Sequence, residues 1–154
     1  MNRYNEKLTL FIAERGVAAE HQVFDESCHS VEEAAAAAGV RPEDFVKSIC
    51  MIRRSGTMAV AVVKGEDRAD RRLVGELLGE KPPRLAKPDE ILQRTGFPCG
   101  GTPPFGFDAV FVIDERVFER EVVYAGGGTP TSLIRLHPVE IERLGAIRGR
   151  VRAE

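Results

Sequence analysis

The stretch SICMIRRSGTMAVAVV, residues 48–63, decides the fold of this chain. Two apolar runs, 48–52 and 58–63, flank a short polar segment that contains Gly56. Apolar runs of this length around a glycine-containing connection are typical of a β-hairpin. The stretch therefore predicts two buried, antiparallel strands near the middle of the chain.

Helices and short strands are expected on both sides of this hairpin. Apolar spacing, capping patterns and terminal glycines predict helices at 4–15, 31–38, 71–78, 89–94 and 138–144, with a brief helical turn from Pro42 to near Lys47. The second of these helices opens with a capping box, Ser30 and Glu33. Short apolar runs predict strands at 20–24, 109–113, 122–125 and 132–136. Because helices and strands do not alternate strictly, we expect an α+β fold with a mixed, mostly antiparallel sheet.

Length and composition limit the functions that are open to the chain. Its 154 residues suit a single domain over 1–154, and its formal net charge of -2 argues against binding to DNA or other long nucleic acid. The three cysteines are scattered, and no apolar run approaches the roughly 20 residues that span a membrane. We expect a soluble, cytoplasmic protein without a membrane contact. The basic C-terminal run from Arg143 to Arg152 is interpreted as a solvated tail.

The segment GFPCGGTPPFG, residues 96–106, is too rich in glycine and proline for the interior of a helix or strand. A glycine-rich backbone can approach a ligand closely, and the prolines stiffen the loop before the ligand arrives. Its N–H groups could therefore hold a carbonyl oxygen and the charge that develops on it. The alternative is a rigid loop that only covers one end of a sheet.

Three other features leave similar alternatives open. Lys47 begins an apolar strand and either lies on a solvated rim or offers its charge to a ligand in a pocket. Gly126, Gly127 and Gly128 form either a bulge that lets another backbone approach or a cradle for phosphate or ribose. Cys99 could be a nucleophile, although no neighbouring residue is an obvious base. The histidines lack metal-ligand spacing, so we predict neither a metal site nor a cofactor.

The order of these motifs resembles the YbaK/prolyl-tRNA synthetase-associated editing domain family. The resemblance runs from about Tyr4 to Leu144, and its most specific parts are Lys47 and the G-x-x-x-P loop Gly100–Pro104. It also includes Val46-Lys47-Ser48-Ile49, Val62-Val63-Lys64-Gly65, Gly96-Phe97-Pro98, Val123-Tyr124-Ala125-Gly126-Gly127-Gly128 and Leu133-Ile134-Arg135-Leu136.

The resemblance implies a sheet partly curled into a barrel, flanked by helices, and hydrolysis of the ester at the 3′ aminoacyl end of mischarged tRNA. In that family the lysine that matches Lys47 contacts the aminoacyl-adenosine end. The loop that matches Gly100, Gly101 and Thr102, with Pro103 and Pro104, holds the ester. The tRNA's own terminal ribose hydroxyl assists the attack of water. The remaining substrate-binding residues implied are Phe24, Gly126, Gly127 and Gly128, and an aminoacyl-tRNA synthetase is a second implied partner.

Two departures bear on the amino acid that is removed. The branch that clears cysteinyl-tRNA has a tyrosine near Phe24 and an aspartate near Leu133, and this chain has neither. The triple glycine and the two adjacent prolines are closer to branches that act on small or hydroxylated amino acids, namely alanine, serine and threonine. A module that binds aminoacyl-tRNA or a synthetase without catalysis is the alternative function.

Overall fold

The computed structural model describes residues 3–24 and 31–154. Its α-helices are α1 (Arg3–Arg15), α2 (Val31–Ala38), α3 (Arg71–Leu78), α4 (Pro88–Thr95) and α5 (Val139–Arg143), with 3-10 helices η1 (Pro42–Asp44) and η2 (Glu115–Glu119). Its strands are β1 (Ala19–Val23), β2 (Val46–Ile52), β3 (Met58–Lys64), β4 (Arg84–Leu85), β5 (Val110–Asp114), β6 (Val123–Gly126), β7 (Ser132–Leu136) and β8 (Ile147–Gly149). The expected α+β class is confirmed.

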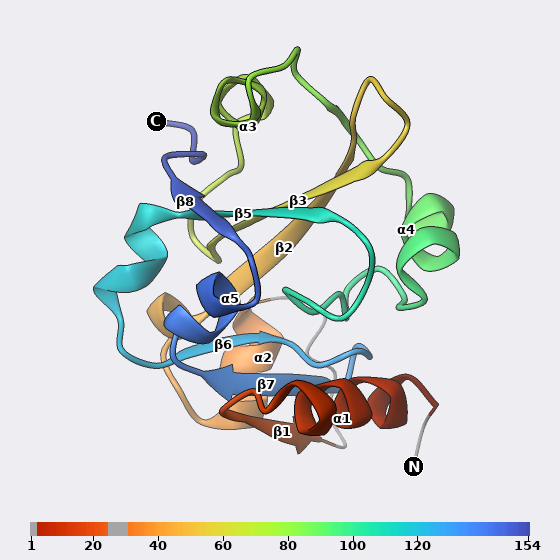
Figure 1. Cartoon of the computed structure of the whole chain (residues 1–154). Helices are drawn as coiled ribbons and strands as arrows, with labels where there is room; N and C mark the ends of the chain where they lie inside the picture. The colour runs from red at the N-terminus through yellow and green to blue at the C-terminus, as the bar shows by residue number, and fades with distance from the viewer. Residues whose placement is uncertain (1–2, 25–30) are drawn as a thin grey trace.

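The strands form two sheets, shown one above the other in Figure 1. A three-stranded antiparallel sheet has the order β1-β7-β6, and a five-stranded mixed sheet has the order β4-β2-β3-β5-β8. Only the pairs β3–β5 and β5–β8 are parallel, so the pairing is mostly antiparallel, as predicted. One parallel bridge between Phe45 and Tyr124 links the two sheets. The expectation of one sheet was wrong, and the described strands form no closed barrel.

The β2–β3 hairpin is the centre of the larger sheet, and every residue of β3 is buried. Val60 and Val62 face a core between the two sheets and α1, whereas Ala61 and Val63 face a second core that α3 covers. Successive side chains of a strand point to opposite faces, so a strand covered on both sides must be apolar throughout. This arrangement explains the unbroken apolar run that dominates the sequence.

Several predicted elements agree closely with the structure. The helix over 71–78 is α3, with the Asp70 side chain accepting hydrogen bonds at its N-terminus and Gly79 in a left-handed conformation at its C-terminus. The strand over 132–136 is β7. The capping box of Ser30 lies outside the described residues. The edge strands β4 and β8 were not predicted, because strands this short carry no periodic pattern.

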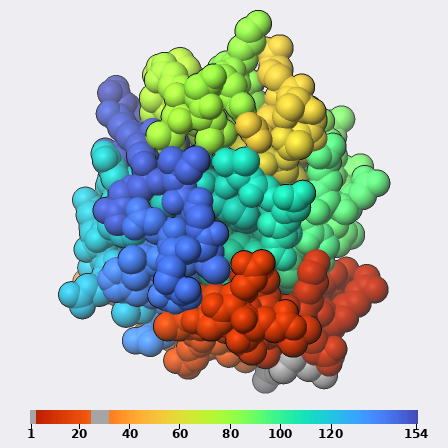
Figure 2. Space-filling model, in the orientation of Figure 1, coloured from red at the N-terminus to blue at the C-terminus, as the bar shows by residue number. Residues whose placement is uncertain are grey.

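The C-terminal basic run is not a solvated tail. Arg148 belongs to β8, forms an ion pair with Glu142 and stacks on the ring of Phe118. Arg152 forms an ion pair with Asp114, which is fully buried. In Figure 2 the C-terminal residues pack against neighbouring parts of the surface beside α3. These arginines join the end of the chain to the five-stranded sheet, which local sequence could not indicate. None of the helices described here is long and apolar enough to cross a bilayer.

Candidate active site

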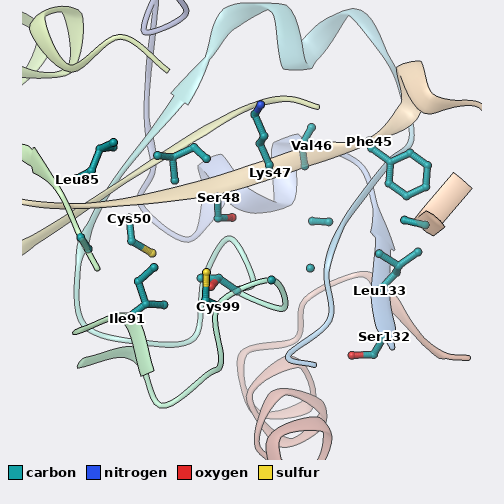
Figure 3. Close-up of a pocket in the computed structure, with 17 residues that line it drawn as sticks. Phe45, Val46, Lys47, Ser48, Cys50, Leu85, Ile91, Cys99, Ser132 and Leu133 are labelled. Atoms are coloured by element: carbon teal, nitrogen blue, oxygen red, sulfur yellow. The ribbon is translucent and has the colours of Figure 1, made fainter. Parts of the chain in front are cut away.

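A cavity of about 370 Å³ lies where the two sheets meet, and Figure 3 shows its walls. The lining residues come from distant parts of the chain: Ala34, Phe45, Val46, Lys47, Ser48, Ile49, Cys50, Leu85, Ala86, Ile91, Cys99, Gly100, Thr102, Ala125, Gly126, Ser132 and Leu133. This set contains no aspartate, glutamate or histidine. Among the residues at 3–24 and 31–154, no group of three His, Cys, Asp or Glu side chains could hold a metal ion.

The first half of β2 forms one wall of the cavity. Strand β4 pairs only with Met51 and Ile52, so the earlier residues of β2 have β3 on one side and the cavity on the other. The N–H of Arg53 donates to the carbonyl of Thr57 at the end of the hairpin. Hydrogen-bonded pairs alternate in an antiparallel ladder, so the N–H and C=O of Ser48 point away from β3. The cavity therefore borders an open strand edge.

The glycine-rich loop forms the opposite wall and is held against the turn that follows β6. The N–H of Gly101 donates to the carbonyl of Pro98 over 3.1 Å, and the N–H of Gly128 donates to the carbonyl of Gly101 over 2.7 Å. A Cβ at Gly101 would lie 2.6–2.7 Å from three backbone atoms of Thr129. Gly101 is thus required for close contact between two backbones, and its N–H already has an acceptor within the loop.

Two other N–H groups of this loop remain available. Gly100 and Thr102 both line the cavity, and within the described residues their backbone N–H groups have no acceptor. They lie on either side of Gly101, whose two hydrogen bonds hold this part of the loop in place. Unpaired N–H groups on a fixed backbone can stabilise a negatively charged oxygen.

The triple glycine, Gly126–Gly128, lets the backbone of β6 and its turn pack closely against other backbone segments. Gly126 pairs with Leu133 in the β6–β7 ladder, and a Cβ on Gly126 would collide with the carbonyl of Thr102. The carbonyl of Gly127 accepts a hydrogen bond from the ring of His21 over 2.7 Å. Burial lowers the pKa of His21, which favours its neutral form. Of the two alternatives left open by the sequence, these contacts match the close approach of backbones.

Lys47 and Ser48 lie side by side on β2 but point in opposite directions. Figure 3 shows the Lys47 side chain leaving the strand on the side opposite to Ser48 and Cys50. Its strand partner Val63 belongs to the core under α3. Partial burial lowers the pKa of Lys47, and the carboxylate of Asp67 opposes that effect. The ammonium group and the glycine loop therefore stand on different sides of β2, although Lys47 is among the residues that line the cavity.

The other predicted residues lie around this cavity rather than in it. Phe24 packs against the cluster of Ala34, Phe45 and Leu133, which includes part of the wall. Pro104 lines a separate cavity beside α1, and neither Pro103 nor Gly128 lines the first one.

Two thiols are found among the described lining residues. Cys99 is exposed, whereas burial raises the pKa of Cys50 to about 12 and keeps its thiol protonated at neutral pH.

Ser48 is a residue of the site that was not predicted from the sequence. Its Oγ is buried and has no hydrogen-bond partner among the described residues. The feature of the sequence that could have indicated it is a single hydroxyl within the otherwise apolar run 48–52. Leu85 and Ile91 were also overlooked, because they reach the cavity only through tertiary packing.

Comparison with known proteins shows which family this chain is similar to. The model of the aminoacyl-tRNA editing domain matches residues 25–144. An uncharacterised protein of Bacillus subtilis (strain 168), YwhH, is 29% identical over 120 residues, covering 77% of this chain and 76% of YwhH. Proline–tRNA ligase of Thermotoga neapolitana is 29% identical over 98 residues, which are 64% of this chain but only 17% of the ligase.

Two solved structures have the same fold over almost their entire length. A candidate trans-editing enzyme for prolyl tRNA synthetase superposes with a TM-score of 0.91 at 29% identity, covering 100% of this chain and 99% of that one. The hypothetical protein APE2540 superposes with a TM-score of 0.87 at 33% identity, covering 96% and 99%. The family model covers well over half of the chain, so this protein belongs to the YbaK-type aminoacyl-tRNA editing domain family.

Proposed function

We propose that this protein is a deacylase that acts as a single, separate domain on mischarged tRNA. It hydrolyses the ester between the amino acid and the terminal ribose, and its substrates carry a small or hydroxylated amino acid such as alanine, serine or threonine. Membership of the editing family and the likeness to a candidate trans-editing enzyme support this function. The aminoacyl 3′ end of tRNA is the proposed partner, and an aminoacyl-tRNA synthetase is a second one.

The observation that carries the proposal is the pairing of an open strand edge with a loop that has free N–H groups. An ester carbonyl bound beside Gly100 and Thr102 would receive two hydrogen bonds, which strengthen as negative charge develops on its oxygen. The open edge of β2 at Ser48 offers a carbonyl to the substrate's ammonium group. The enzyme therefore holds the reacting groups in place and stabilises the charge of the transition state.

We propose that the substrate itself supplies much of the proton transfer. The described lining contains no carboxylate or imidazole, and the Cys50 thiol stays protonated. We propose that water attacks the ester with the help of the neighbouring ribose hydroxyl of the tRNA itself. Lys47, whose ammonium lies on the other side of β2, would then bind the phosphate of the terminal nucleotide outside the cavity.

The absence of a general base among the described lining residues also favours a second candidate, a module that binds aminoacyl-tRNA without cleaving it. Incubation with alanyl, seryl, threonyl and cysteinyl esters on tRNA, at stoichiometric and at catalytic protein concentrations, separates the two. A deacylase releases many amino acids per protein molecule. Protection of the ester, or release limited to one equivalent, would support the binding module.

Two lysine variants test whether hydrolysis depends on the proposed site. Lys47→Ala should lower the rate of hydrolysis strongly, whereas Lys81→Ala, an exposed lysine that does not line the cavity, should not. Equal effects of the two substitutions would remove Lys47 from the proposed site.

A further inference from the structure

The hydroxyl of Ser48 is a buried polar group without a partner. Its Oγ is inaccessible to solvent and has no hydrogen bond among the described residues, although the residue lines the cavity. Buried hydroxyls nearly always have a partner, because a hydroxyl that leaves water without one is costly. By contrast, the other serine of the lining, Ser132, is bonded through its Oγ to Thr129 over 2.7 Å. A partner for the Ser48 hydroxyl must therefore come from a bound molecule.

The surroundings of this hydroxyl restrict the chemistry of a partner. In Figure 3 the Ser48 side chain lies on the same side of β2 as Cys50, with Cys99 opposite, and a rotation about its Cα–Cβ bond would present the covered Oγ to a ligand in the cavity. Among the described lining residues there is no carboxylate or imidazole, the Cys50 thiol is protonated at neutral pH, and the Lys47 ammonium points away. A charged ligand group would lack a counter-charge here. A small, neutral hydroxyl can both donate to and accept from Ser48 Oγ and needs no charge.

The other polar groups of the cavity have separate tasks in the proposed reaction. The N–H groups of Gly100 and Thr102 face the ester carbonyl, and the open edge of β2 faces the ammonium group. The ribose hydroxyl assists the attack of water in the proposed reaction, so the amino acid's side chain is the part of the substrate left to reach a group on the face of β2.

We propose that Ser48 selects the substrate by a hydrogen bond to the side-chain hydroxyl of a seryl or threonyl ester, so that the enzyme prefers these esters to alanyl. This inference rests on the proposed deacylase function. A single neutral hydrogen bond that replaces an unpaired buried hydroxyl is worth about tenfold in an equilibrium or rate ratio. An alanyl ester leaves Ser48 Oγ as unpaired as it is in the free protein.

The test is the ratio of kcat/KM for seryl to alanyl esters on one tRNA. We expect the protein to prefer the seryl ester by about tenfold, and Ser48→Ala to reduce this ratio to about one. Ser48→Thr, which keeps the hydroxyl, should retain the preference. Ser55→Ala in the exposed hairpin turn is the matched control and should leave the ratio unchanged. Affinities for amide-linked seryl and alanyl adenosine, which cannot be hydrolysed as esters, should show the same ratios.

The outcomes separate this inference from the proposed function. Turnover of both esters with no seryl preference, or with a preference that Ser48→Ala leaves intact, overturns the role of Ser48 and leaves the deacylase standing. If Ser48→Ala lowers kcat/KM equally for both esters, Ser48 has a general structural role, and its proposed role in selection is overturned. If the protein turns over no ester, the deacylase fails and the selection fails with it.

Discussion

Substituting Gly101 by alanine should reduce catalysis far more than stability, because it displaces the loop that carries the proposed oxyanion donors. A Cβ at this position would lie 2.6 Å from the backbone N and C of Thr129, where ordinary contact begins near 3.4 Å. The loop must therefore move by about 0.8 Å, and overpacking of this kind costs roughly 1–3 kcal/mol. For a chain of this size we expect the melting temperature to fall by about 2–12 °C.

The same displacement acts on Gly100 and Thr102, the neighbours of Gly101 in the chain. A misplacement of about 1 Å can reduce a rate by about 10²-fold, which is also the scale for the loss of one oxyanion donor. We therefore expect Gly101→Ala to lower single-turnover deacylation by about 10²-fold, and the bulkier Gly101→Val to lower it at least as much.

The assay is single-turnover deacylation well below the melting temperature, with thermal unfolding measured on the same preparation. Gly16→Ala is the matched control, because Gly16 has a φ of +61 and open space around its Cβ position. An alanine in that left-handed conformation costs about 1–2 kcal/mol. It should destabilise the protein to a similar degree without changing the rate. A destabilised Gly101→Ala variant that deacylates normally would refute the placement of this loop in the active site.

Three further predictions concern other parts of the molecule. Lys47→Ala should lower kcat/KM by roughly 10- to 150-fold with an unchanged melting temperature. Because partial burial lowers the pKa of Lys47, activity that needs its charge should fall with rising pH earlier than for an ordinary lysine, and Lys47→Arg should move that fall to higher pH. Cys99→Ala should retain most activity, and an acyl-enzyme trapped on Cys99 would contradict the mechanism. Mass spectrometry after alkylation should find Cys99 modified and Cys50 protected, because Cys99 is exposed and Cys50 is buried. Asp114→Ala should lower the free energy of unfolding by about 3 kcal/mol in a denaturant titration, because buried Asp114 accepts hydrogen bonds from Val151 and Arg152. A loss below about 1 kcal/mol would show that water replaces the carboxylate as the acceptor of these bonds.

Features that arise from interactions between residues close in the chain could be predicted from the sequence. The hairpin follows from two apolar runs around a short turn, and α3 follows from its Asp70 and Gly79 ends. The family could be recognised for the same reason, since its motifs are local runs in a given order. The irregular loop was also foreseen, because glycine and proline disfavour regular structure wherever they occur.

Contacts between segments far apart in the chain were decided only by the tertiary structure. Whether Lys47 or Ser48 enters the cavity depends on which face of β2 is covered by α3, and a shift of one residue would exchange them. The ion pair between Arg152 and buried Asp114 depends on β8 joining β5.

The need for glycine at position 101 likewise depends on tertiary structure, because it arises from the backbone of Thr129 packing against Gly101. The sequence by itself determined the helices and the longer strands, and which family the chain resembles, because short-range sterics, capping and periodicity act within a few residues. The structure decided which groups of those elements face one another across the cavity, because packing depends on every covered face at once.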